Sequence, residues 1–186
     1  MLLKSLNVRV HTPTDFIPRG RGFYQLEEEA LYFPVEYPGE RPRFFSFLDS
    51  EFLSFHISRD GRLLFLDLTL PRRRWRVTRN FIAPETALLA DIRFLDFRLG
   101  IKNPITFCDR SRQHLMFRFS EGPAEHNYYL AENLIAQIDT ANHLVAIWAR
   151  DIVDDLAGQE ILSWRRTVRG MLVPGHPPIS VPTPRM

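Results

Sequence analysis

The sequence predicts a mainly β fold of two related antiparallel β-meander halves that pack pseudo-symmetrically, with few short helices and a proline-rich C-terminal tail. Three observations carry this prediction: a segment that occurs twice, alternation of apolar and polar residues, and turn residues between the alternating runs. Alternation has the two-residue period of a β-strand, and a repeated unit indicates a repeated substructure.

The repeat is the strongest of these observations. Residues 47–66 align without gaps on residues 128–147, an offset of 81 positions. Upstream, residues 30–35 match residues 114–119 at an offset of 84, because the turn before Phe47 is three residues longer in the first copy. Insertions in turns cost little free energy, so the change of offset is compatible with two homologous halves.

Each copy contains a predicted β-hairpin. In the first, Asp60-Gly61 separates the strand-like runs 52–57 and 62–68, and in the second Ala141-Asn142 takes the same place. Glycine, aspartate and asparagine tolerate the positive φ angles that tight hairpin turns require. The sequence therefore predicts two equivalent hairpins.

The remaining elements are predicted from shorter patterns. Residues 6–10 alternate as a strand, and a basic strand is expected after each hairpin, with Trp75 matched to Trp164 at an offset of 89. A short helix is allowed at 84–91, where proline suits a first helical turn, and a helical turn at 151–158.

The predicted organisation is a first β repeat at 1–83, a second at 84–173 and an extended tail at 174–186. This organisation is compatible with both repeats packing into one compact domain. The tail carries five prolines, too many for a core strand or helix, and is expected along the surface or across a partner.

Composition limits the functional classes. The 186 residues are 45% hydrophobic and 25% charged, which excludes disorder of the whole chain, and the net charge of +2 is too small to indicate nucleic acid. The single cysteine, Cys108, excludes an internal disulfide, and there is no signal-peptide-like or membrane-spanning apolar run. We expect a cytoplasmic protein that does not enter the membrane.

One family resemblance rests on the repeated segments. The first copy contains Ala30-Leu31-Tyr32-Phe33 and, after a turn, residues 57–66 (ISRDGRLLFL), and the second contains 114–123 and 134–147. These resemble the motifs D-x-L-Y-I-x-L and V-D-x-D-G-R-I-V-G-I-E-I of the small bacterial domain-of-unknown-function family 2283. The second copy lacks the aspartate-glycine pair. The resemblance implies a small β-sheet domain, assigns no catalytic residue, and hints at protein binding.

Arginines form the main candidate site. A cluster around Trp75 and its counterpart beside Trp164 are candidate anion-binding groups that could contact phosphates while the indole stacks on a base. The alternative is that these arginines pair with nearby carboxylates on a solvated surface. The candidates are Arg72, Arg73, Arg74, Arg76, Arg165 and Arg166.

Two further site types were weighed. Glu51 and Glu132 occupy equivalent positions and are weak candidates for a catalytic carboxylate pair, against a simple role in the turn. Cys108, His114 and His126 flank one predicted strand, but a metal site needs more convergent ligands, so no metal or cofactor is predicted.

The functional prediction is a non-enzymatic binding or interaction module with a protein partner or a homodimer. Alternation, turns and core aromatics account for most residues, and common nucleotide-binding and hydrolase motifs are absent. One alternative is an enzyme or small-ligand binder with its site in the groove between the repeats. The other, less favoured, is nucleic-acid binding through the arginine-tryptophan strands.

Overall fold

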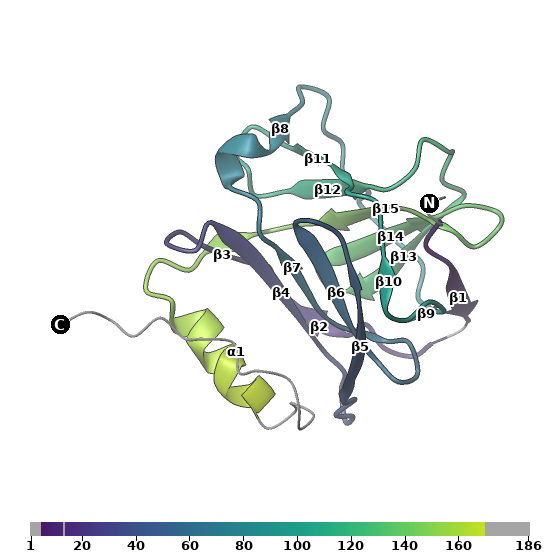
Figure 1. Ribbon diagram of the computed structural model, residues 1–186. Helices are drawn as coiled ribbons and strands as arrows, with labels where there is room; N and C mark the ends of the chain where they lie inside the picture. The colour runs from purple at the N-terminus through teal and green to yellow at the C-terminus, as the bar shows by residue number, and fades with distance from the viewer. Residues whose placement is uncertain (1–4, 13, 170–186) are drawn as a thin grey trace.

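The computed structural model describes residues 5–12 and 14–169, and it confirms a mainly β fold with antiparallel sheets (Figure 1). The predicted tail at 174–186 lies outside the described residues. Within the described residues, no helix has the length and apolarity needed to cross a membrane.

The first sheet contains most strands of the N-terminal half. Its order is β10-β5-β6-β7-β4-β3-β16, and β2 pairs with β4 beside this path. Neighbours are antiparallel except β10 with β5 and β16 with β3. The strands are β2 (Arg19–Gly20), β3 (Phe23–Gln25), β4 (Ala30–Glu36), β5 (Phe44–Asp49), β6 (Leu53–Ser58), β7 (Leu63–Leu68), β10 (Leu99–Gly100) and β16 (Val153–Asp154).

The second sheet has the order β13-β14-β15-β12-β11-β8, and a separate ribbon pairs β1 with β9. The central order β13-β14-β15-β12-β11 repeats the arrangement β5-β6-β7-β4-β3 of the first sheet. The strands are β1 (Val8–His11), β8 (Arg76–Val77), β9 (Asp91–Phe94), β11 (Ile105–Cys108), β12 (Leu115–Arg118), β13 (His126–Ala131), β14 (Leu134–Ile138) and β15 (Leu144–Ala149).

Strand register recurs between the sheets at the offsets of the sequence alignment. Leu53 opposes Leu68 in the β6–β7 pair, and Leu134 opposes Ala149, 81 positions later, in the β14–β15 pair. Both pairs carry a β-bulge at the matching position, between His56 and Ile57 in one and between Gln137 and Ile138 in the other.

Both predicted hairpins are confirmed. Gly61 has φ +86° and Asn142 has φ +62°, so the residue at the end of each turn is left-handed, as the turn chemistry requires. The Gly61 N–H donates to the Ser58 carbonyl at 3.0 Å, and the Asn142 N–H donates to the Asp139 carbonyl at 3.1 Å. The two turns therefore share one hydrogen-bond pattern.

The β1–β9 ribbon joins the tips of both hairpins. The Phe94 N–H donates to the Gly61 carbonyl at 2.8 Å, and the Val8 N–H donates to the Asn142 carbonyl at 3.0 Å. Val8 and Phe94 are themselves opposite each other in the ribbon. One short ribbon thus contacts each sheet through an equivalent backbone hydrogen bond.

Aromatic and aliphatic side chains from both sheets form one buried cluster. Phe33 and Phe55 of the first sheet and Phe117 of the second are fully buried. The Phe55 ring lies 5.5 Å from that of Phe94 and 5.9 Å from that of Phe119. Burial of such large rings supplies much of the free energy of folding, and these contacts join the two halves.

Strands at the borders are exchanged between the halves. β8 follows the first hairpin in sequence but pairs with β11 of the second sheet, while β10 and β16 of the C-terminal half join the first sheet. Each sheet is therefore completed by chain from the other half.

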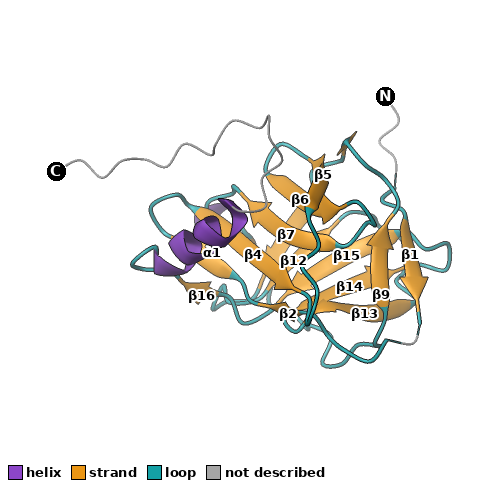
Figure 2. Ribbon diagram, turned by 90° about the horizontal axis from the view of Figure 1, so that it is seen from below, coloured by secondary structure: helices purple, strands orange, loops and turns teal. Residues whose placement is uncertain are grey.

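Two predicted elements are wrong, and the helix that the sequence allowed at 84–91 does not form. Residues 84–91 are extended, because the Leu88 backbone bonds to Asn127 and Tyr129 along β13 and thereby satisfies polar groups at a sheet edge. The stretch 151–158 contains β16 and a turn in place of a helical turn. The predicted basic strand around Trp164 is helix α1 (Gln159–Arg169), which lies across the first sheet beside β4 (Figure 2).

A nearby side chain stabilises the N-terminus of α1. The Asp155 carboxylate accepts hydrogen bonds from the N–H groups of Glu160 (3.4 Å) and Ile161 (3.1 Å), which have no intrahelical acceptor. In the first half the corresponding residues form a short 3₁₀ helix, η1 (Arg72–Arg74), followed by the two-residue strand β8. Trp75 and Trp164 therefore lie in different secondary structures.

Candidate anion-binding site

The candidate site is built around Arg62, which lies between the turn of the first hairpin and β7. Arg62 is buried, with 9% of its surface exposed, and its guanidinium lies 5.1 Å from the centre of the Tyr37 ring. It pairs with Glu40 and lies 3.5 Å from the Asp91 carboxylate. The side chain is thus held by groups from the β4–β5 loop and from β9.

A second arginine extends this network. Arg93 on β9 pairs with Asp91, and its Nη1 donates to the Asp60 carbonyl at 3.2 Å and also to the Asp60 carboxylate. Burial alone would raise the pKa of Asp60, but the Ser58 hydroxyl, Arg93 and Arg62 outweigh burial and lower it. Asp60 and Asp91 each lie within ion-pair distance of both Arg62 and Arg93, so they link the two arginines.

An open basin of about 500 Å³ lies over this network. Three exposed arginines border it, and within the described residues none of them forms an ion pair or a side-chain hydrogen bond: Arg41, Arg43 and Arg59. Glu40, Pro42, Ser58, Asp60 and Arg62 complete the lining. Because Arg62 and Asp60 are already paired, the three exposed guanidinium groups leave the basin with a net positive charge.

Two arginines of the predicted cluster around Trp75 pair with carboxylates. Arg72 donates to Asp154 at 2.6 Å and lies over the Tyr24 ring, and Arg73 pairs with Glu29. The Trp75 indole is buried and donates to the Leu70 carbonyl at 3.0 Å. An indole used in this way is not presented for stacking on a base.

The predicted second cluster lies on a different element, helix α1, and pairs with the residue next to the partner of Arg73. Arg165 on α1 contacts both carboxylate oxygens of Glu28 at 2.9 Å. Arg74 on η1, Arg76 on β8 and Arg166 on α1 are exposed. The residues predicted as one anion-binding pair of strands are thus distributed over a 3₁₀ helix, a short strand and an α-helix.

Glu51 and Glu132 lie in turns of different sheets. Glu51 is in the β5–β6 turn, where its carboxylate accepts from the Asn103 amide at 3.0 Å. Glu132 is in the β13–β14 turn, where its backbone N–H donates to the Pro18 carbonyl at 2.9 Å. Both residues are exposed, and they contact different remote segments, at Asn103 and at Pro18, so the structure does not bring them together as a pair.

The residues weighed for metal binding also have other roles. Cys108 is buried, and burial raises the pKa of its thiol. The His114 ring accepts the Asp151 N–H at 3.3 Å, and the His126 ring lies 5.8 Å from that of Tyr128. Among the described residues no group of three or more histidine, cysteine or acidic side chains is placed to hold a metal ion.

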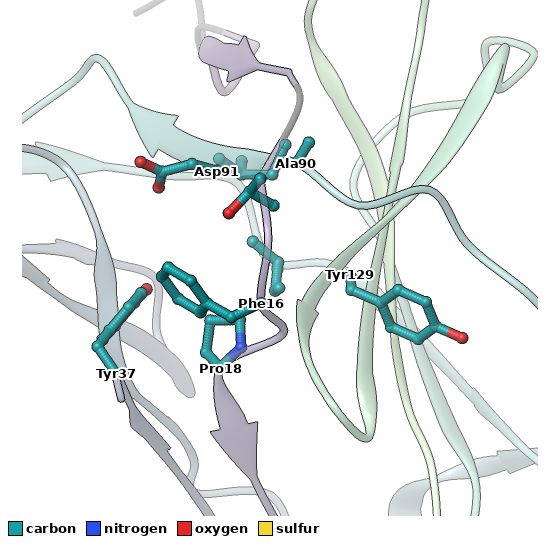
Figure 3. A pocket seen from close by; sticks show the side chains of 9 residues that line it. Phe16, Pro18, Tyr37, Ala90, Asp91 and Tyr129 are labelled. Carbon is teal, nitrogen blue, oxygen red and sulfur yellow. The ribbon is translucent and has the colours of Figure 1, made fainter. Parts of the chain in front are cut away.

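A second hollow, of only about 10 Å³, lies between the two halves, where Phe16 and Pro18 come close to Tyr37 (Figure 3). Its polar groups serve internal contacts: the Tyr37 hydroxyl donates to the Leu63 carbonyl at 2.9 Å, and Asp91 pairs with Arg93. The Tyr129 ring points away from the hollow. These features are those of a packing seam.

Sequence reasoning missed Arg41, Arg43, Arg59 and Arg62 because they lie in two separate turns. A signal was present, since Glu40-Arg41-Pro42-Arg43 and Arg59-Asp60-Gly61-Arg62 both combine arginine with an acidic residue and a turn former. Only the β5–β6 pairing, in which Phe44 opposes Ser58, brings the two turns together.

Comparison with known proteins adds no assignment: no protein-family model matches the chain, and neither does any curated protein. The resemblance to family 2283 stays a prediction.

Proposed function

We propose that this protein is a non-enzymatic binding module, and that the arginine-bordered basin over Arg62 binds an acidic segment of a protein partner. The observation that carries the proposal is the placement of Arg41, Arg43 and Arg59 around one open basin, without carboxylate partners among the described residues. Guanidinium groups bind carboxylates in a planar, two-pronged manner, so three of them suit several acidic side chains.

The ion-pair network of Arg62 and Arg93 supports this role because it fixes the turns that border the basin. Glu40 and Asp60 line the basin and are tied to Arg62 or Arg93, so the turns that carry the exposed arginines are fixed to β9. A surface whose backbone is already ordered loses less conformational entropy when it binds a partner. The buried arginine is therefore a positioning residue, and the exposed arginines are the contacting residues.

A protein partner is favoured over nucleic acid by the distribution of charge. Nucleic-acid binding uses a basic track along the phosphate backbone, often with aromatic side chains for stacking. Arg72, Arg73 and Arg165 are paired with carboxylates, and the Trp75 ring is buried. A single basin fits a short acidic segment better, from another protein or from a second copy of this chain.

The experiment measures binding of fluorescein-labelled poly-L-glutamate by anisotropy. We expect the triple variant Arg41→Ser, Arg43→Ser, Arg59→Ser to bind at least about tenfold more weakly, since each charged hydrogen bond contributes about 1.5–3 kcal/mol. The control Arg73→Ser, Arg74→Ser removes exposed arginine charge elsewhere and should bind within about twofold of wild type.

Equal losses in the triple variant and the control would show that only overall charge matters and would overturn the proposal. A single-stranded DNA oligonucleotide is the parallel probe. If it binds more tightly than poly-L-glutamate and loses affinity in the control variant, the nucleic-acid alternative replaces the proposal.

We also infer that the two sheets arose by tandem duplication, with repeats at about 1–83 and 84–173. The shared strand order, the equivalent bulges and the equivalent contacts of the β1–β9 ribbon support this inference. The basin then belongs to the first copy alone: Arg59 and Arg62 correspond to Thr140 and His143 in the second hairpin. One copy would carry the binding site while the other serves as scaffold.

A further inference from the structure

An exposed apolar patch lies next to the arginine basin. Phe45 on β5 and Phe97 are 44% and 38% exposed, and their rings meet edge to face at 5.6 Å. Leu95, two residues before Phe97, is 44% exposed. Phe45 is only two residues beyond Arg43 of the basin, so the patch begins beside the basin at the start of β5.

The backbone is specifically shaped at this patch. Phe45 is the extra residue of a β-bulge, because Phe44 pairs with Ser58 and Ser46 pairs with the adjacent Ile57. Bulges re-aim side chains and often lie beside functional sites. Next to this bulge the Phe45 ring is exposed, while the adjacent Ser46 is buried.

The facing segment is held by an unusual contact. Arg98 has φ +52°, which is uncommon for a residue with a side chain, and its N–H donates to the buried Ser46 hydroxyl at 3.0 Å. This hydrogen bond ties the segment that carries Phe97 to the bulge that carries Phe45. The β-bulge at Phe45 and the positive φ of Arg98 thus both lie beside the exposed Phe45–Phe97 pair.

We propose that Phe45, Phe97 and Leu95 form an apolar subsite, and that the occupant is an extended peptide segment with an aromatic side chain close to its acidic residues. This inference rests on the proposed function, since the neighbouring arginines would bind the acidic residues. Residues of an extended strand advance about 3.3 Å each, so Arg43 and Phe45 lie about 7 Å apart along the chain. A partner with glutamates flanking phenylalanine matches both charge and spacing.

The test uses two labelled nine-residue peptides of equal charge, Glu-Glu-Phe-Glu-Glu-Glu-Phe-Glu-Glu and the same sequence with serine in place of phenylalanine. Wild-type protein should bind the phenylalanine peptide about fivefold more tightly, as expected for one or two aromatic contacts. In Phe45→Ser, Phe97→Ser this advantage should disappear, while the serine peptide binds as before.

Val77→Ser is the control, because Val77 is similarly exposed but lies on β8 of the second sheet, and it should keep the full advantage. Urea unfolding midpoints identify any variant that is not fully folded. Leu95→Ser then serves as a milder replacement, with a partial loss of the advantage expected.

The outcomes separate the two proposals. If both peptides bind wild type equally, and the triple arginine variant weakens both, the subsite is overturned and the arginine basin stands. If the advantage of the phenylalanine peptide survives in Phe45→Ser, Phe97→Ser, the aromatic contact lies elsewhere and the subsite is also overturned. If neither peptide binds, both proposals fail.

Discussion

Gly61 shows how much one residue decides. It combines φ +86° with close packing: a Cβ built on it would lie 2.3 Å from the Phe94 carbonyl oxygen. The same residue accepts the hydrogen bond that docks the first hairpin on β9. Gly39 has a similar φ of +72° but nothing within 4 Å of its virtual Cβ. Comparing Gly61 with Gly39 therefore separates the energetic cost of backbone strain from that of steric overlap.

We expect Gly61→Ala to lower the free energy of unfolding by about 3 kcal/mol, from left-handed strain of about 1 kcal/mol plus overpacking of about 1–3 kcal/mol. Gly39→Ala should cost only about 1 kcal/mol. Urea denaturation measures both changes. Equal costs for the two variants would contradict the packing argument.

Asp139 carries a pH-dependent contribution to stability. The His143 backbone N–H donates to the Asp139 carboxylate at 2.8 Å and lowers the pKa of that carboxyl below its ordinary value of 3.8, outweighing burial. The His143 ring and the Ala141 N–H act in the same direction. Because the native-state pKa is the lower one, this contribution is complete above the ordinary value and is lost as the pH falls through the native value.

We therefore expect Asp139→Asn to be less stable than wild type at pH 7, with a difference that shrinks as the pH falls below about 3.9. Urea unfolding at pH 7 and pH 2.5 measures this. Glu132→Gln, at an exposed turn position, is the control. A difference that grows on acidification would refute the assigned sign.

At the scale of elements, the contacts between α1 and the first sheet include an aromatic stack and an ion pair. The Trp164 ring lies 3.8 Å from the Phe65 ring at an interplanar angle of 12°, and Arg165 pairs with Glu28. Phe65 also contacts His56 edge to face, and His56 pairs with Asp67 at 2.9 Å. The helix thus covers a mixed aromatic and charged face of the sheet.

Loss of the stack should free α1 while the sheet stays folded. In Trp164→Ala we expect hydrogen exchange of the α1 amides to accelerate about tenfold or more, corresponding to at least about 1.4 kcal/mol, with little change in β6 and β7. Leu162→Ala, at an exposed position of the same helix, is the control. Equal acceleration in β6 and β7 would mean that the helix and sheet unfold together.

Some secondary-structure elements can be predicted from the sequence and others cannot. Both hairpins follow from turn chemistry and alternation, which act over a few residues. In the segment around Leu88 the proline, alanine and leucine residues are compatible with a helix, yet its backbone pairs with Asn127 and Tyr129. Pairing with a remote strand outweighs the small differences in helix propensity.

At the scale of the whole molecule, the exchanged strands join the halves. The first sheet needs β10 and β16 from the second half, and the second sheet needs β8 from the first. The β1–β9 ribbon bonds to both hairpins. Each half on its own would leave unpaired strand edges and part of the shared core exposed.

We accordingly expect the fragment 1–82 expressed alone not to fold cooperatively, whereas co-expression with 83–186 should restore a complex that co-purifies. The cut follows Ile82, which is 80% exposed, so it interrupts little packing. Circular dichroism and thermal unfolding measure the result. A cooperative transition in the isolated first fragment would contradict this dependence between the halves.

The basin also belongs to this scale. Arg62 is 22 residues from Glu40, and Arg93 is 33 residues from Asp60, so the network exists only after the hairpin has docked on β9. The predicted anion-binding arginines formed two short runs in the sequence, yet they lie on three different elements, η1, β8 and α1. Adjacency in sequence was a poor guide to adjacency in the folded protein.

By itself, the sequence determined the β class, the two hairpins and their left-handed turn residues, because strand alternation and turn preference are local properties of the chain. Only the tertiary structure decided the exchanged strands, the place of α1 and the group of arginines at the basin. Those features depend on strand pairing and ion pairs between segments far apart in the sequence. Such contacts stabilise the protein only once folding has brought the segments together.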